Sequence, residues 1–125
     1  MEQLSRLSLK DLILWRMAMD LAVLVHQCCA SLPRSEIHGV ISQLRRAATS
    51  VPSNIAEGYA RRSTKEFIPF LRAARGSMAE LETQLLLAQR VGYLADSDIT
   101  GLQDQIEEIG RILHAVVAAL HRRQG

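Results

Sequence analysis

The sequence predicts an all-α protein, a single antiparallel up-down-up-down four-helix bundle over residues 1–125. Apolar residues make up 48% of the chain but aromatic residues only 4%, a balance that favours aliphatic helix packing over a β-sandwich. Apolar residues also recur at steps of three and four along four segments, about 9–32, 34–60, 64–91 and 97–122. Because short links join these segments, an antiparallel bundle is the economical arrangement.

The first helix is expected over residues 9–32. Ser8 offers an N-cap, with Asp11 three residues later, and Pro33 ends the helix. The apolar seam contains Leu14, Ala18, Leu21, Val25, Cys28 and Leu32. A second apolar stripe beside it contains Trp15, Met19, Ala22 and Cys29, so we expect this helix to be buried over a broad arc.

The second helix is expected over residues 34–60, with Ser35 as its cap and Gly58 as its terminating residue. Pro52 lies inside it and removes the hydrogen bond to the carbonyl of Ala48, which predicts a bend. We expect Ser50 or a partner group to satisfy the freed carbonyl. The seam contains Ile37, Ile41, Leu44, Ala48, Val51 and Ile55.

The last two helices carry the longest seams. Ser63 and Glu66 have the spacing of a capping box, Pro69 predicts a kink or an irregular first turn, and Gly92 ends the third helix. Its seam contains Phe67, Leu71, Ala74, Met78, Leu81, Leu85 and Ala88. The fourth helix has Asp96 or Ser97 as its cap, and its seam contains Ile99, Leu102, Ile106, Ile109, Leu113, Val116 and Leu120.

The N-terminal region predicts a cytoplasmic protein. Arg16 and Asp20 interrupt the first apolar stretch, so neither a signal peptide nor a membrane span is expected. Cys28 and Cys29 are adjacent on an apolar helix, where a disulfide between neighbours is strained and the other ligands of a zinc site are missing. We expect reduced, buried thiols.

An arginine-rich polar strip on the second helix is the main candidate for function. Residues 40–76 carry seven basic side chains and two acidic ones, and arginine pairs well with phosphate or carboxylate. The candidate residues for binding nucleic acid or a partner are Arg45, Arg46, Ser50, Asn54, Glu57, Arg61, Arg62, Arg72 and Arg75. The alternative is that these arginines pair with the acidic residues of the last third, or with a neighbouring subunit.

The reverse face of the third helix is too small and too apolar for an ordinary wet surface. Small residues let another backbone approach closely, and Glu80 on the same side could meet Arg46 or Arg61 of a neighbouring helix. We therefore predict an oligomer interface formed by Gly76, Ser77, Ala79, Glu80, Thr83 and Leu87.

The sequence offers little for an enzyme. It contains no phosphate-binding glycine loop, no nucleophile elbow and no paired-cysteine zinc spacing. No histidine follows a glutamate by three residues, as in di-iron bundles. Glu80 and Glu82 are two apart on a helix and do not face each other. We predict no catalytic residue, no metal and no cofactor.

Two motifs carry a resemblance that covers about residues 12–120. The stretch QLRRAATSVPSNIAEGYARRS, followed by EFIPFLRAARGSMAELETQLLLA, resembles the four-helix bundle family encoded in intervening sequences of bacterial 23S ribosomal RNA genes. It is similar, more distantly, to the accessory variability determinant of diversity-generating retroelements. Pro69 and the Cys28–Cys29 pair look particular to this chain.

The resemblance implies a homopentamer, a barrel with a central channel, but no agreed biochemical activity. The accessory variability determinant binds nucleic acid and reverse transcriptase through basic residues. By likeness, the positions of interest are Arg45, Arg46, Ser50, Asn54, Glu57, Gly58, Arg61, Arg62, Ser77 and Glu80.

Two functional hypotheses follow. In the first, the oligomer binds RNA or DNA through a basic surface, with low sequence specificity because exposed aromatic residues other than Tyr59 do not accompany the arginines. In the second, the protein is an oligomeric scaffold, or interaction module, whose polar strip is used at subunit or partner interfaces.

Overall fold

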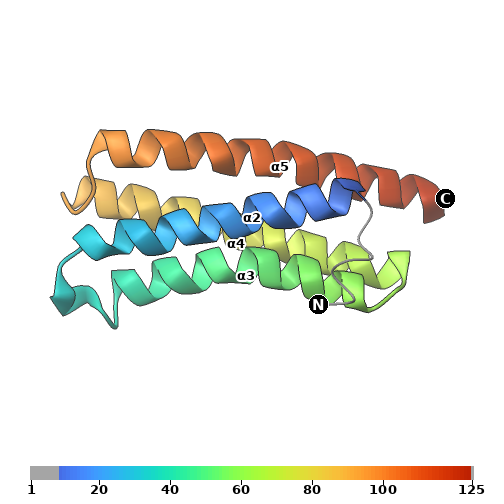
Figure 1. Ribbon diagram of the computed structural model, residues 1–125, viewed down its shortest axis with the longest axis horizontal. Helices are drawn as coiled ribbons and strands as arrows, with labels where there is room; N and C mark the ends of the chain where they lie inside the picture. The colour runs from blue at the N-terminus through green and yellow to red at the C-terminus, as the bar shows by residue number, and fades with distance from the viewer. Residues whose placement is uncertain (1–8, 125) are drawn as a thin grey trace.

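The computed structural model describes residues 9–124. In this range the chain forms four α-helices and no strand, and Figure 1 shows them side by side along one long axis, with the chain reversing direction from each helix to the next. The helices are α2 (Leu9–Cys28), α3 (Val40–Ala60), α4 (Thr64–Arg90) and α5 (Asp96–Gln124). The all-helical prediction is confirmed for these residues.

Each helix packs on two of the others. α3 lies between α2 and α4, and α5 lies between α4 and α2. α2 and α4 are therefore diagonal neighbours, as are α3 and α5. A surface on α2 and a surface on α4 consequently face different directions.

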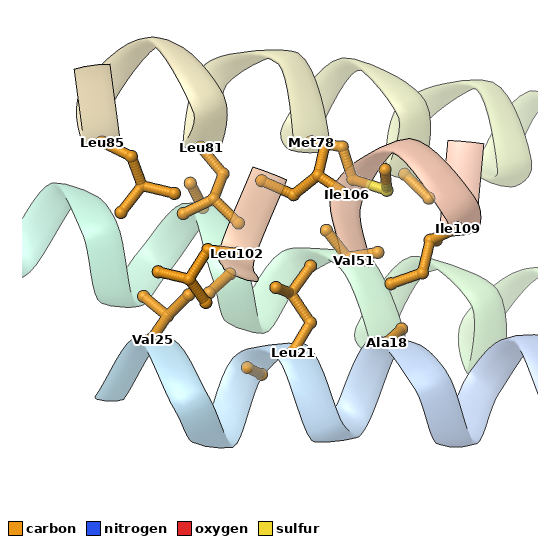
Figure 2. Close-up of a cluster of buried hydrophobic side chains, with 14 of the residues drawn as sticks. Ala18, Leu21, Val25, Val51, Met78, Leu81, Leu85, Leu102, Ile106 and Ile109 are labelled. Atoms are coloured by element: carbon orange, nitrogen blue, oxygen red, sulfur yellow. The ribbon is translucent and has the colours of Figure 1, made fainter. Parts of the chain in front are cut away.

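The core lies where the four apolar seams meet. Every predicted seam residue of α4 and α5 is buried, because the steps of three and four keep one stripe of each helix turned inward. Figure 2 shows side chains from all four helices pointing toward one another, among them Leu21, Val51, Leu81 and Ile106. Aliphatic packing of this kind is the main stabilising term of the fold.

α2 is less buried than the sequence predicts. Leu14, Ala18, Leu21 and Val25 are buried, but Met19, on the predicted second stripe, is 40% exposed. A tight 3₁₀ turn over Cys29–Ser31 follows the helix and turns Cys29 inward, while Cys28 is only half-buried. Both cysteines are free thiols, as predicted. The predicted cap Ser8 lies outside the described residues.

α3 begins later than predicted. Residues Arg34–Glu36 form a separate 3₁₀ turn, with Pro33 rather than Ser35 at its cap position. Gly39 then adopts a non-helical conformation (φ −113°, ψ −113°) directly before Val40. The hydroxyl of Tyr93 donates a 2.9 Å hydrogen bond to Oε2 of Glu36. This tertiary contact holds the turn out of the helix.

Gly58 is not the terminating residue that the sequence predicts. It is buried inside α3, and a Cβ at this position would lie 2.5 Å from Cβ of Phe70 and 2.9 Å from Cδ1 of Phe67. The glycine therefore allows α3 and α4 to approach closely. The helix ends two residues later at Ala60, and Arg62 takes the left-handed conformation (φ 61°).

Both ends of α4 agree with the prediction. The side chain of Ser63 accepts a hydrogen bond from the backbone N–H of Glu66 at 3.4 Å. At the other end, Gly92 has φ +86°. The N–H groups of Gly92 and Tyr93 donate to the carbonyls of Gln89 and Ala88, which is the Schellman arrangement.

The start of α5 differs in its capping. Neither Asp96 nor Ser97 precedes the helix, since Asp96 is its first residue. Oδ2 of Asp98 accepts a 2.9 Å hydrogen bond from the N–H of Ala95, and Asp96 instead accepts one from the side chain of Gln89 at 2.7 Å. The acidic first turn still satisfies the exposed helix terminus.

Candidate functional site

The predicted polar strip runs along the outer face of α3, and the hydrogen bonds of Arg46 and Asn54 lie within that helix. Arg46 donates to Oε1 of Gln43 at 2.7 Å, and Asn54 donates to the carbonyl of Ser50 at 2.7 Å. Arg61 and Glu57 form an exposed ion pair at 3.9 Å, of a kind that adds little stability. Neither arginine makes the predicted contact with Glu80 inside one copy.

Ser50 does not satisfy the carbonyl freed by Pro52 as predicted. Its hydroxyl donates to the carbonyl of Ala47 at 2.9 Å, one residue before the carbonyl of Ala48. Back-bonding of this kind along a helix is ordinary for serine. α3 continues through the buried proline to Ala60.

Arg45 differs from the rest of the strip, because it also contacts Cys29. It is half-buried, and its Nε atom is buried without a hydrogen-bond partner. Burial raises the pKa of the Cys29 thiol, and the nearby Arg45 guanidinium partly opposes that rise. The Cys28 pKa is also raised, by burial first and then by Asp98 and Cys29. Both thiols are therefore protonated near neutral pH.

Arg72 and Arg75 are separated from the α3 strip. Both are exposed on α4, and Arg72 contacts Nε2 of His121 on α5 at 2.9 Å. The predicted set of nine binding residues thus divides among different faces. Ser50, Asn54 and Glu57 belong to the outer face of α3 and not to one common pocket.

One end of the bundle collects basic side chains from α2, α4, α5 and the link that follows α3. The first turn of α2, the last turn of α3, the first turns of α4 and the last turn of α5 meet there (Figure 1). Among the described residues of these ends, seven basic side chains are exposed, against the acidic residues Asp11, Glu57 and Glu66. We call these seven the basic end: Lys10, Arg61, Arg62, Lys65, Arg72, Arg122 and Arg123.

A hollow of about 380 Å³ opens at the basic end. Arg62, in the link after α3, and Arg123, on α5, line it together with Ser63, Tyr59 and Asp11. Arg123 lies beyond the residues that the sequence suggests for binding, because its meeting with Arg62 depends on which helix ends come together. The cluster of basic residues at the C-terminal end of the chain was the one available signal.

The aromatic rings near the basic end already pack against other side chains. Tyr59 packs edge-on against Phe67, with ring centroids 6.1 Å apart and an interplanar angle of 75°. The guanidinium of Arg61 lies 5.1 Å from the ring centre of Phe70, a cation–π distance. Base stacking on these rings would require them to leave their present partners.

The predicted interface strip on α4 is open to solvent in a single copy. Gly76 has no atom within 4 Å of where a Cβ would stand, and Leu87 is 49% exposed. Ala79, Glu80 and Thr83 are also exposed, whereas Ser77 is half-buried. Because no other described residue covers it, the strip is available for a contact with another molecule.

α2 exposes more apolar surface than the sequence suggests. Of the six large apolar residues described as exposed, four lie on this helix: Ile13, Met19, Val23 and Leu24. By length and composition, the segment Lys10–Ser31 would also be long and apolar enough to cross a membrane, a test that core helices pass as well. Periodicity did not reveal this face, because α2 is apolar nearly all round.

No metal site emerges from the part of the chain that the structure describes. Within residues 9–124, no three side chains of His, Cys, Asp or Glu are grouped closely enough to hold a metal ion. The exposed candidates are the basic end, the α4 strip and the apolar face of α2.

Comparisons with known proteins give one family and one fold. A sequence model of the family described as "23S rRNA-intervening sequence protein" matches residues 10–115. A crystal structure of a protein of unknown function, from the S23 ribosomal protein family of Bacteroides thetaiotaomicron, matches with a TM-score of 0.79 at 23% identity. The match covers 88% of this chain and 99% of that one. No curated protein matches the chain.

Proposed function

Because the chain belongs to the 23S rRNA-intervening sequence protein family, we propose that it is a non-enzymatic, oligomeric protein that binds the phosphate backbone of RNA or DNA. The observation that carries this proposal is the basic end, where four helix termini bring seven exposed basic side chains together. Arginine and lysine on such a surface bind phosphates and release counterions. The family name makes structured RNA the first ligand to test.

The binding is expected to have low sequence specificity. Tyr59 and Phe70 near the basic end are engaged with Phe67 and Arg61, so stacked bases have no free aromatic platform there. Contacts to phosphate position a nucleic acid without reading its sequence. Backbone charge and shape would therefore determine the affinity.

The assembly is part of the same proposal. The protein forms a homopentamer of antiparallel up-down-up-down bundles in the cytoplasm, with no cofactor and no membrane association. The exposed α4 strip, with Gly76 and Leu87, supports self-association. The distant resemblance to the accessory variability determinant, drawn from the sequence motifs, supports nucleic acid as the ligand.

A salt titration tests the binding proposal. Structured RNA and duplex DNA are titrated with the protein at a low and a high salt concentration. We expect affinity for both ligands to fall steeply with salt, and the double variant Arg62→Glu with Arg123→Glu to bind at least tenfold more weakly, since two phosphate contacts become repulsive. The unfolding transition and molecular mass should not change, because both side chains are exposed.

A matched control makes the same charge change at the other end of the bundle. Arg34 and Arg90 are both exposed there, so the variant Arg34→Glu with Arg90→Glu has the same net charge as the first. We expect it to lose much less affinity. Equal losses in the two variants would mean that net charge, and not the basic end, determines binding. Affinity that ignores salt would rule out the proposal.

A scaffold is the second candidate, and the position of Arg46 favours it. Arg46 lies in the second turn of α3, away from the basic end, on a groove of about 630 Å³ that it shares with Arg45, Thr49 and Ser53. The measurement that separates the two hypotheses is nucleic-acid binding by the Arg62 and Arg123 variant. Under the scaffold hypothesis, Arg46→Glu lowers the molecular mass in light scattering while the Arg62 and Arg123 variant binds nucleic acid no differently from wild type.

A further inference from the structure

We infer that, in the proposed ring, the α4 strip of one copy packs into an apolar groove between α2 and α3 of the next copy. The inference rests on the proposed self-assembly and goes beyond it by assigning the second half of the contact. The residues that carry it are Val23 in the groove, Leu87 on the strip, and the charged pair Arg46 and Glu80.

The groove is an open, mainly apolar depression on the described surface. It has a volume of about 650 Å³ and runs between the two helices. Trp15, Met19, Ala22 and Val23 line it from α2, and Pro52 and Ala56 line it from α3. Val23 is 50% exposed and Met19 is 40% exposed. A contiguous exposed apolar patch more often marks an interaction site than an ordinary solvated surface.

A lipid bilayer fits this face poorly. Arg16 and Asp20 are both exposed on α2 among the apolar residues. Charged side chains inside hydrocarbon are costly and need partners there. A protein surface can accommodate both kinds of residue, so the expected occupant is a protein.

A closed ring needs two different surfaces on each copy. A contact made by one self-complementary patch gives a two-fold dimer, whereas a head-to-tail contact between unlike patches gives a ring. The groove lies between α2 and α3, and the strip lies on the outer face of α4, which packs on α3 and α5 rather than on α2. They therefore face different directions, as the two halves of a ring contact must.

The chemistry of the α4 strip matches that of the groove. Gly76, Ala79 and Thr83 have small side chains, so a neighbouring backbone can approach this strip closely. Leu87 protrudes from it at 49% exposure and offers an apolar side chain to the groove. Glu80 lies two turns before Leu87 on the same side of the helix.

Charge complementarity selects the α4 strip over the other exposed helix. The apolar groove adjoins the groove that Arg46 lines, because Thr49 and Ser53 line both. A partner surface must therefore place an acidic residue next to an apolar one, as Glu80 and Leu87 do. The outer face of α5 carries Asp104, Glu107 and Glu108, but no large apolar side chain of that helix is described as exposed.

The first test uses light scattering of the full chain after gel filtration. Wild type is expected at about 70 kDa, five copies of 13.9 kDa. Val23→Lys blocks the groove, Leu87→Lys blocks the strip, and each should give a monomer. The control Ala115→Lys adds the same charge to an exposed position on α5 and should leave the ring intact. Circular dichroism and urea midpoints confirm that each variant folds.

Mixing the two blocked variants distinguishes a head-to-tail contact from a symmetric one. Val23→Lys keeps a working strip and Leu87→Lys keeps a working groove, so the mixture should form a one-to-one dimer of about 28 kDa and grow no further. A symmetric contact of α2 with itself would leave Leu87→Lys assembled and the mixture without a new species. Either result would overturn the inference.

A charge swap tests the pairing of Arg46 with Glu80. Arg46→Glu and Glu80→Arg should each weaken assembly at least tenfold, and the double variant should recover most of it. Wild type that is a monomer at every concentration would refute the ring itself. A wild-type ring that Val23→Lys leaves unchanged would refute only the groove assignment and leave the proposed assembly standing.

Discussion

At the scale of single residues, Gly58 shows how one missing side chain sets a helix contact. Its position opposite Phe67 and Phe70 leaves no room for a methyl group. The sequence suggests a helix terminus at this glycine, because glycine often ends helices. Its true role depends on Phe70, twelve residues further along the chain and on another helix.

Replacement of Gly58 by alanine should destabilise the protein by about 1–3 kcal/mol, because the packed helices must move apart to admit the new methyl group. Gly101→Ala is the matched control. Gly101 is exposed within α5 with open space around it, so alanine there should stabilise by about 0.5–1 kcal/mol through its higher helix propensity. Urea unfolding at one fixed protein concentration measures both. Equal effects would mean that the contact with Phe70 is not tight.

Tyr93 supplies a pH-dependent contact between two turns. Its pKa is raised, first because its hydroxyl donates a hydrogen bond to Glu36 and then because the carboxylate charge disfavours the phenolate. The folded protein thus holds this proton more tightly than the unfolded chain does. The resulting stability is complete below about pH 10, the ordinary tyrosine value, and is lost as the pH rises through the raised pKa.

The prediction is that Glu36→Ala lowers the pKa of Tyr93 toward its ordinary value. Phenolate absorbance is followed against pH in a Tyr59→Phe background, so that Tyr93 is the tyrosine that titrates. Glu36→Gln is the intermediate case, since an amide can still accept the hydrogen bond but carries no charge. If Tyr93 has the same pKa in the Tyr59→Phe protein and in both Glu36 variants, Glu36 does not accept a hydrogen bond from its hydroxyl in solution.

At the scale of the elements, the seams of α4 and α5 were fully predictable. Both helices turn one face to the core over their whole length, and the apolar period reports that directly. The start of α3 was not predictable in the same way. Residues 34–39 carry a helical pattern, but Gly39 and the contact between Glu36 and Tyr93 override it.

Truncation of a central seam residue tests the core assignment. Leu81 is fully buried in α4, so Leu81→Ala should cost about 2–5 kcal/mol of unfolding free energy, through lost apolar burial and the cavity that remains. Leu81→Met nearly conserves volume and should cost less than about 1.5 kcal/mol. The comparison is made by urea unfolding. An alanine variant as stable as wild type would place Leu81 outside the core.

At the scale of the whole molecule, the candidate sites could be predicted only in part. The excess of arginine in the middle of the chain was visible, and Arg61, Arg62 and Arg72 do reach the basic end. Arg122 and Arg123 join them only because the last turn of α5 lies beside the first turn of α4 (Figure 1). Composition cannot report which helix ends meet, and that meeting is a property of the assembled bundle.

The proposed assembly predicts a stability that depends on protein concentration. When folded copies associate and unfolded chains do not, mass action favours the folded state, so the thermal midpoint of wild type should rise with concentration. Val23→Lys should show a midpoint that is independent of concentration. Calorimetry over a hundredfold range of protein concentration makes the comparison. A flat wild-type midpoint would argue against self-association in solution.

The clustering of basic residues at one end of the bundle gives the proposed ring two unlike poles. Copies related by rotation about a single axis all point the same way along it, so in a ring whose bundles stand parallel to that axis every Arg62 and Arg123 would lie at one pole. Asp96 and Asp98, at the start of α5, would lie at the opposite pole. Such a particle is vectorial: a polyanion would approach it from the pole that carries Arg62 and Arg123, because at the other pole Arg34 and Arg90 lie among acidic residues.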